Sequence, residues 1–371
     1  MNKINLVNFK SLKNSELELS NVTLLTGINS TGKSSVIQAI LFIKQNLLKV
    51  EKISQLSLLN PLDIIKTVTL NGEYIDLGIG RNILYENAET DQIMIGFETK
   101  VNNCTFEIDT KEAMDNEILP CKVMATNSTR LLSKNNFQYL KAERVGARVF
   151  YEYSKASIDC GEVGSSGEYT AHYLAQNKNK KINILSLKHP NASTEQLLEN
   201  ASKWLSEVSK GIDIKCEIIQ DLRKVKLTYG YERAKKDYLP QDVGFGITYV
   251  LPIIVAILKA KPGDLLIIEN PESHLHPSGQ VKIAKLCALA GNAGVQIIIE
   301  THSDHFLNGL RVAVKEKKLE SKDLKIHYFE KDLEEAKSVI TEIKVDTNGK
   351  IETWPKGFFD EFDIQLEKLL W

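Results

Sequence analysis

The first residues able to do chemistry form a glycine-rich loop near the start of the chain. The loop is Gly27-Ile28-Asn29-Ser30-Thr31-Gly32-Lys33-Ser34-Ser35, between the β-rich run 21–26 and the helical pattern 36–43. In that context the spacing G-x-x-x-x-G-K-S is typical of a loop whose backbone N–H groups surround a phosphate at a helix start. Lys33 then reaches the β- and γ-phosphates, and the Ser34 hydroxyl binds Mg²⁺. A glycine-rich turn that matches by chance is the alternative, and the flanking strand and helix argue against it.

Two carboxylates follow a buried strand later in the chain. The turn 262–264 leads into the apolar run 265–268, which ends at Glu269, and Glu272 follows three residues later. Acids at the carboxyl end of a parallel strand lie beside the phosphate loop of a neighbouring strand. We therefore expect Glu269 to hold Mg²⁺, directly or through water, and Glu272 to polarise the attacking water. Solvated acids at a strand end are the alternative.

A histidine stands at the end of the next predicted strand. The run 295–300 is apolar up to Glu300, and Thr301-His302-Ser303-Asp304 follows it. From that position His302 can hydrogen bond to a γ-phosphate or to the attacking water, and so report which nucleotide is bound. An ordinary surface or core histidine is the alternative.

A second glycine-containing helix start precedes the apolar stretch that leads to Pro262. Asp242-Val243-Gly244-Phe245-Gly246-Ile247-Thr248 places two glycines where a helix begins, which favours an anion-binding terminus. The chain has one nucleotide loop, so a second phosphate-seeking site indicates the nucleotide of a partner. A tight turn in which the glycines serve packing is the alternative.

In this order the four motifs resemble the ABC-type ATPases of the SMC, RecF and OLD group. The chain is most similar to the compact bacterial AAA-type ATPases found with phage-defence and DNA-maintenance systems. The resemblance extends over nearly the whole chain, including the segments Ile4–Leu12, Leu70–Gly78, Ala142–Arg148, Gly167–Tyr169 and Trp354–Asp360.

The resemblance implies the α/β fold of a P-loop NTPase of the ABC/SMC-head type, with a mixed sheet and helices on both of its faces. We expect residues 1–50 to hold the phosphate loop, 51–240 to form an inserted α+β lobe, and 241–371 to complete the core.

The resemblance also implies that two heads enclose two ATP molecules. The residues implied to bind ATP within one copy are Gly27, Asn29, Ser30, Thr31, Gly32, Lys33, Ser34 and Ser35. Gly244 and Gly246 would cap the γ-phosphate of ATP bound to the other copy. Catalytic roles fall to Lys33, Glu269, Glu272 and His302, with Ser34 and Glu269 at the metal.

Two departures from the family pattern bear on activity. Asn270 stands where the family has the second acid of a pair, and an amide cannot act as a general base. Hydrolysis then depends on Glu272 or is slow. The usual signature serine is replaced by Val243, and Thr248 is a candidate substitute hydroxyl.

Patterns elsewhere predict a few further elements. We expect a hairpin over 93–108 that turns near 101–104, strands at 214–219 and 224–229, and edge strands at 325–330 and 339–345. A capping box at 193–196 predicts a helix that ends near 210. A turn at 346–349 and an amphipathic helix over 358–370 close the chain, and no heptad run is long enough for a coiled-coil arm.

Composition bounds the possible classes of protein. The 371 residues are 43% hydrophobic and 26% charged, as in globular proteins, and the net charge of −1 gives no overall basic field. Five cysteines without a C-x-x-C pair indicate reduced thiols, and the start of the chain lacks a signal-peptide pattern. The longest apolar run, 247–258, is too short to span a bilayer. We therefore predict a cytoplasmic protein with no membrane partner.

Two basic stretches interleaved with aromatic residues could form a nucleic-acid groove. They comprise Arg130, Lys134, Lys141, Arg144 and Arg148, then Arg223, Lys224, Lys226, Arg233, Lys235 and Lys236, with Phe137, Tyr139, Tyr229 and Tyr231 between them. A solvated charged face is the alternative, which the net charge favours. The histidines of the C-terminal part fall within the nucleotide motifs, so we expect no zinc site.

We therefore predict an ATPase with ATP and Mg²⁺ as its ligands, which forms a homodimer around ATP. We expect it to act as the sensor or motor subunit of an antiviral-defence or DNA-maintenance complex whose effector, for example a nuclease, is encoded separately. Nucleic acid stays an open partner. The alternative is a nucleotide-gated scaffold with negligible hydrolysis, and a third class is the ATPase subunit of a transporter.

Overall fold

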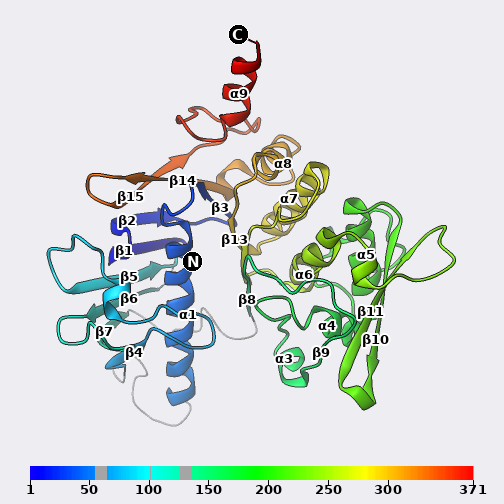
Figure 1. Ribbon diagram of the computed structural model, residues 1–371, viewed down its shortest axis with the longest axis horizontal. Coiled ribbons are helices and arrows are strands. Elements are labelled where there is room, and N and C mark those ends of the chain that lie inside the picture. Colours follow the sequence, from blue (N-terminus) through cyan, green and yellow to red (C-terminus); the bar gives the residue numbers. More distant parts are fainter. Residues whose placement is uncertain (55–64, 101, 126–135, 371) are drawn as a thin grey trace.

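A mixed β-sheet forms the centre of the molecule (Figure 1). The computed structural model describes residues 1–54, 65–100, 102–125 and 136–370, and within them this sheet has six strands in the order β15-β14-β3-β13-β12-β8. Its strands are β3 (Val22–Gly27), β8 (Phe137–Leu140), β12 (Leu265–Glu269), β13 (Gln296–Glu300), β14 (Leu324–Asp332) and β15 (Lys337–Ile343). All neighbours are parallel except β14 and β15. The fold is that of the predicted P-loop NTPase. β14, expected at an edge, lies inside the sheet because it pairs with β3 as well as β15.

The side chains of the central sheet pack into two separate hydrophobic cores. Leu24 and Ile268 pack into one core, whereas their neighbours Leu25 and Ile267 pack into the other. Successive side chains of a strand point to opposite faces of the sheet, so continuous apolar runs such as 265–268 are buried on both sides.

Helix α1 (Lys33–Ser54) and an antiparallel sheet cover one face. This second sheet has the order β2-β1-β5-β6-β7-β4. Its strands are β1 (Lys3–Phe9), β2 (Leu12–Glu18), β4 (Thr67–Thr69), β5 (Gln92–Glu98), β6 (Asn103–Asp109) and β7 (Ile118–Ala125), with the short helix α2 (Gly80–Ile83) between β4 and β5. The predicted 93–108 hairpin is confirmed by the antiparallel pairing of β5 with β6.

Helices cover the other face of the central sheet, together with a three-stranded sheet. The helices are α4 (Thr170–Asn177), α5 (Leu197–Val208), α6 (Phe245–Lys259), α7 (Pro277–Asn292) and α8 (Asp304–Lys315), and the short α3 (Lys155–Asp159) lies nearby. The sheet joins β9 (Tyr151–Glu152), β10 (Ile212–Ile219) and β11 (Lys224–Tyr231) in the order β10-β11-β9. The predicted strands at 214–219 and 224–229 are confirmed. The capping box is wrong: α5 begins at Leu197, and Glu199 accepts hydrogen bonds from the Ser193 and Thr194 backbone.

The described residues of the stretch 51–240 contribute to all three sheets. β4 to β7 extend the N-terminal sheet, β8 pairs with β12 at the edge of the central sheet, and β9 to β11 form the third sheet. Strand partners distant in sequence leave no local pattern, so these pairings could not be predicted from the sequence.

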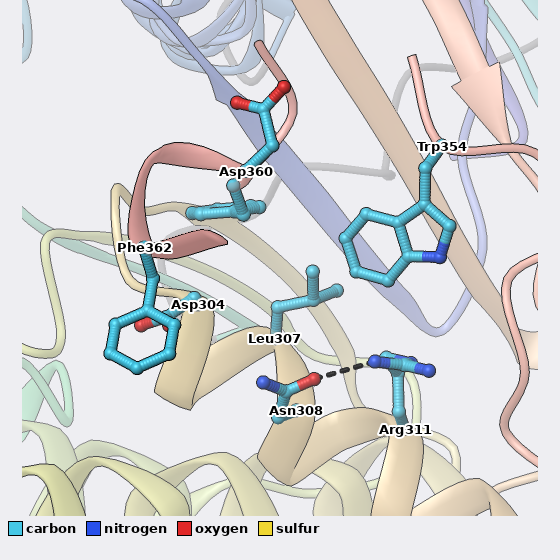
Figure 2. Close-up of a pocket in the computed structure, with 8 residues that line it drawn as sticks. Asp304, Leu307, Asn308, Arg311, Trp354, Asp360 and Phe362 are labelled. Carbon is cyan, nitrogen blue, oxygen red and sulfur yellow. Dashed lines mark hydrogen bonds between the residues drawn. The ribbon is translucent and has the colours of Figure 1, made fainter. Parts of the chain in front are cut away.

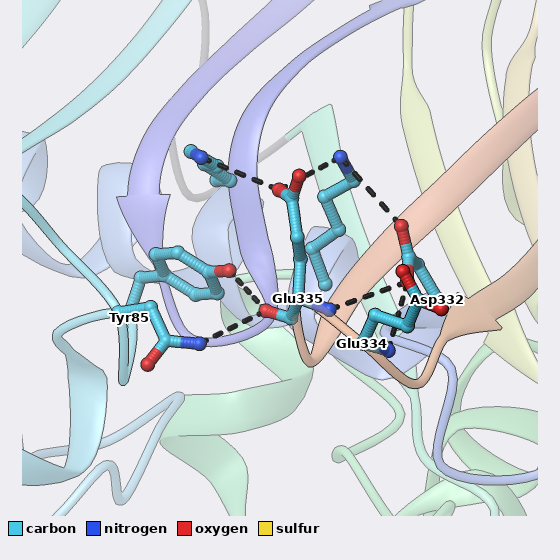
Figure 3. A network of polar contacts seen from close by, with 7 residues as sticks. Tyr85, Asp332, Glu334 and Glu335 are labelled. Carbon is cyan, nitrogen blue, oxygen red and sulfur yellow. Dashed lines mark hydrogen bonds and ion pairs between the residues drawn. The ribbon is translucent and has the colours of Figure 1, made fainter.

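The β14–β15 turn ties the central sheet to the N-terminal sheet (Figure 3). The Glu335 carbonyl accepts hydrogen bonds from Tyr85 and Asn87, and its carboxylate pairs with Lys13 and Lys337. These contacts hold the β14–β15 turn against Tyr85, Asn87 and Lys13.

Two elements close the chain. The 346–349 turn is confirmed by a hydrogen bond from Gly349 N to Asp346 O, and α9 (Glu361–Leu370) is the last helix. None of the helices in the described ranges has both the length and the apolar character of a membrane span.

Candidate functional site

The phosphate loop leaves β3 through a backbone that only glycine adopts without strain. Gly27 has φ +135°, and a Cβ there would lie 2.2 Å from the Phe329 carbonyl oxygen of β14. Gly32 has φ +101°, and its Cβ would lie 2.3 Å from the Ser338 hydroxyl. Both positions therefore require glycine for conformation and for space.

The loop is held by its own side chains. Thr31 donates to the Ile28 carbonyl at 2.7 Å, and the Lys33 ammonium donates to the carbonyls of Gly27 and Ile28 at 3.1 and 2.6 Å. Lys33 is buried, and burial lowers the pKa of its ammonium, while the nearby Glu300 raises it. The remaining predicted ATP ligands divide by exposure. Ser35 is buried, whereas Asn29, Ser30 and Ser34 are exposed.

The Ser34 hydroxyl meets Glu300, the last residue of β13. It donates to the two carboxylate oxygens of Glu300 at 3.0 and 3.1 Å. Burial and the charge of Glu269 raise the pKa of Glu300 to about 7, whereas Ser34 and Lys33 oppose that shift. The prediction had missed Glu300. Its place at the end of a strand was visible in the sequence, but β13 had to be known to lie directly beside β3.

Glu269, the predicted metal ligand, is engaged elsewhere. Its carboxylate accepts hydrogen bonds from the Tyr139 hydroxyl at 2.9 Å and the Ala142 backbone N–H at 3.0 Å. β13 lies between β12 and the phosphate strand β3, so Glu300 and not Glu269 contacts Ser34. Glu269 stays close enough for its charge to raise the pKa of Glu300.

Arg144 fixes the turn that follows β12. Its guanidinium donates to the carbonyls of Glu269 and Asn270 at 2.7 and 2.8 Å, and also to those of Lys141 and Tyr249. Burial lowers the pKa of Arg144 to about 10, so the group stays charged at neutral pH. The sequence predicted an exposed Arg144, either on a solvated face or in a nucleic-acid groove, but the side chain is buried and bound to backbone carbonyls, so it positions a site and is closed to nucleic acid.

Asn270 adopts a left-handed backbone with φ +44°, and its N–H donates to the Glu300 carbonyl at 2.8 Å. Asparagine tolerates this conformation better than most residues. The amide that replaces the usual acid therefore suits the turn that links the ends of β12 and β13.

Glu272 and His302 meet beside the phosphate loop. One Glu272 oxygen accepts the His302 backbone N–H at 2.8 Å, while the other, Oε2, is buried without a hydrogen-bond partner among the described residues. Burial and the Lys33 charge lower the pKa of His302, which favours the neutral form of its imidazole. His302 lines a cavity of about 360 Å³ with Gly27 and Ile28. Of the predicted catalytic residues, the structure therefore brings Lys33, Glu272 and His302 together.

The start of α6 is arranged differently from the predicted signature loop. Gly246 packs against the loop after β12, where an added Cβ would lie 2.2 Å from the His274 carbonyl oxygen. Gly244 has φ −58° and precedes the helix without a side-chain cap. Thr248 is buried one turn inside α6, so it cannot replace the signature serine at the helix start.

The donor set fits a metal–nucleotide complex better than a metal alone. Within the described ranges no three His, Cys, Asp or Glu side chains group closely enough to hold a metal ion. A hydroxyl and one carboxylate, Ser34 and Glu300, share one point, which suits a Mg²⁺ ion that takes its other ligands from phosphate and water.

Within the described residues, the two basic stretches do not line a groove with their aromatic side chains. Phe137 and Tyr229 are buried, Lys224 pairs with Glu152, and Arg130 and Lys134 lie outside the described residues. A solvated surface accounts for the exposed remainder.

Comparison with known proteins identifies the class. Residues 1–307 match the family described as AAA ATPase domain, and the chain therefore belongs to that family. Residues 319–369 match a second family, described as protein of unknown function (DUF3696). A search of curated proteins gives no match.

Solved structures of SMC heads share the fold. A head bound to the C-terminal winged-helix domain of ScpA aligns at 14% identity with a TM-score of 0.53, covering 93% of this chain and 98% of that chain. The Pyrococcus furiosus head with an extended coiled coil, bound to the C-terminal domain of ScpA, aligns at 13% identity with a TM-score of 0.51, covering 100% and 99%. The protein is an AAA ATPase with the fold of an SMC head.

Proposed function

We propose that this protein binds ATP with Mg²⁺ and hydrolyses it, and that two copies close around the nucleotide. The observation that carries the proposal is the Oε2 of Glu272, which is buried and has no hydrogen-bond partner in the part of the chain that the structure describes, beside His302 and the phosphate loop. A buried acceptor without a donor suits a carboxylate that receives a proton from water.

Each residue has a defined part in this proposal. Lys33 would exchange its carbonyl partners for phosphate oxygens, and Ser34 and Glu300 would hold the metal, which would supply positive charge to those oxygens. Glu272 takes the proton of the attacking water, and the neutral His302 orients that water or the γ-phosphate. Glu269 and Arg144 position the turn that carries Glu272.

The second copy would supply the start of α6. Its helix N-terminus has no side-chain cap, so its N–H groups can face an anion. We further propose that the dimer is the sensor or motor subunit of a defence or DNA-maintenance complex with a separately encoded effector, for example a nuclease. The SMC heads of similar fold are bound to domains of another protein, ScpA, which supports partner binding in general.

The test combines ATP turnover and solution mass for the wild type and Glu272→Gln, with and without DNA. We expect Glu272→Gln to lower turnover by about 10²- to 10⁴-fold, the usual contribution of a general base, and to accumulate an ATP-bound dimer. Glu300→Gln should raise the Mg²⁺ concentration needed for turnover more than the matched Glu269→Gln. Equal turnover in the wild type and Glu272→Gln would refute the assigned base.

A nucleotide-gated scaffold is the second candidate, and Asn270 in place of an acid favours it. An ATP-dependent dimer in which neither the wild type nor Glu272→Gln hydrolyses ATP would support the scaffold.

A further inference from the structure

The last helix, α9, carries an apolar stripe that the described part of the chain leaves uncovered. Phe362, Leu366, Leu369 and Leu370 are 72%, 41%, 83% and 68% exposed, at the spacing of one helical face. Figure 1 shows α9 in red, rising away from the sheets. A helix of 10 residues is marginal in water by itself, so its apolar face indicates a surface that covers it.

The base of α9 lies against the phosphate loop. The cavity lined by Gly27, Ile28 and His302 is also lined by residues just before and at the start of α9, namely Gly357, Phe359, Asp360 and Glu361. Phe359 and Asp360 also line a neighbouring cavity on the Leu307 and Arg311 side of α8 (Figure 2). The nucleotide site and α9 therefore share one short segment.

That segment gives α9 a fixed starting direction. Gly357 and Phe359 have φ +81° and +53°, so the chain turns sharply twice before the helix. Between them Phe358 is buried, with its ring centroid 5.2 Å from those of Tyr328 and Trp354. The left-handed backbone of Phe359 costs free energy, so it persists only where the surrounding packing enforces it.

Exposed apolar side chains also occur at the start of α6 and in the loop that follows Gly146. The α6 patch consists of Val149, Phe150 and Phe245, which are 40%, 38% and 46% exposed. The Phe245 ring rests on His274 at a centroid distance of 4.8 Å, and the backbone at Gly146 lies directly against it.

α9 is acidic on balance, with Lys368 as its one basic residue, while the charges near the α6 patch are mixed, since Arg148, Glu143 and Asp242 are all exposed there. Glu361 and Glu367 are exposed on α9, and Arg148 is exposed next to Val149. Apolar contact with a charged rim is the usual anatomy of a protein interface.

We propose that the apolar stripe of α9 docks on the α6 patch of a second copy of this chain, with Glu367 near Arg148. The inference rests on the proposed function, in which the phosphate loop of one copy meets the α6 start of the other. α9 begins beside the phosphate loop of one copy, and the α6 patch lies at the α6 start of the other. When the two copies close around ATP, the stripe of α9 therefore meets the α6 patch. Two-fold symmetry gives two such contacts in each dimer.

The experiment measures the dimer dissociation constant with ATP and Mg²⁺ in the full-length Glu272→Gln background. A fluorescent ATP analogue measures nucleotide binding by the monomer in parallel. Leu369→Ser and Phe150→Ser should each weaken the dimer by roughly tenfold or more, as expected for an interface anchor, while leaving nucleotide binding unchanged. Leu333→Ser and Leu222→Ser, at exposed turn positions, are matched controls that should leave the dimer intact.

Charge reversal provides a sharper test of the pairing. Glu367→Lys and Arg148→Glu should each weaken the dimer, and the double variant should recover most of the loss. A dimer constant unchanged by Leu369→Ser and Phe150→Ser overturns the inference, while the ATPase proposal stands. A Glu272→Gln protein that binds ATP but stays monomeric overturns the docking and the dimer together. Absence of ATP binding overturns the proposed function itself.

Discussion

Two helix starts in this molecule look alike in sequence and differ in structure. Both α1 and α6 begin at glycines that were predicted to bind phosphate. At the start of α1, the side chains form hydrogen bonds within the same chain: the Lys33 ammonium donates to loop carbonyls, and the Ser34 hydroxyl donates to Glu300. At α6, the described chain provides no side-chain cap, and Phe245 is exposed.

The glycines differ in the same way. Gly32 needs its positive φ, and Gly246 needs the space beside His274, but Gly244 needs neither, since a Cβ there would meet only Ile247 at 4.0 Å. The packing alternative therefore explains Gly246 and leaves Gly244 unexplained within one copy. The start of α1 is hydrogen bonded by side chains of its own chain, whereas the start of α6 leaves space for a group of another molecule.

The largest effect should come from the helix start that completes itself. Lys33→Ala removes the ammonium that would meet the phosphates, and we expect turnover to fall by about 10²- to 10³-fold. Steady-state hydrolysis measures this change, and unfolding in urea checks that the variant folds. Turnover near the wild-type level would show that the α1 start is not the catalytic one.

The paired variants Gly246→Ala and Gly244→Ala test the α6 start. Gly246→Ala forces a Cβ onto a backbone carbonyl and should lower the free energy of unfolding by roughly 1–3 kcal/mol. Gly244→Ala should lower it by less than about 1 kcal/mol. If Gly244 faces the other copy's nucleotide, its variant weakens the ATP-dependent dimer despite that small change in stability. A fully active, fully dimeric Gly244→Ala would contradict the difference between the two glycines.

The smallest effect concerns the far end of α6. Burial lowers the pKa of Lys259 to about 8, so the folded state binds fewer protons than the unfolded state between that pH and the ordinary lysine pKa. The free energy of unfolding should therefore rise with pH across this interval, and Lys259→Met should remove the rise. At pH 7 the variant should be more stable by on the order of 1–2 kcal/mol. Urea unfolding at pH 7 and 10 measures both, with the exposed Lys261→Met as the control.

The sequence predicted what depends on local geometry. The phosphate loop needs a strand, two glycines and a helix in succession, and all three lie in one continuous segment of the sequence. Glu300 was missed because the order of β3, β13 and β12 depends on pairing between distant strands. Arg144 was misassigned because its carbonyl partners come from four separate backbone positions, and nothing in its neighbourhood distinguishes a buried arginine from an exposed one.

The position of β3 has a consequence for the newly made chain. β3 is synthesised long before both of its partners in the sheet, β13 and β14. At a synthesis rate of about 5–20 residues per second, roughly 15–60 s separate β3 from β14. During that interval Gly27 lacks the Phe329 backbone and Ser34 lacks Glu300, so the loop has no fixed shape. Nucleotide binding should therefore begin only after β14 has been made and has paired with β3.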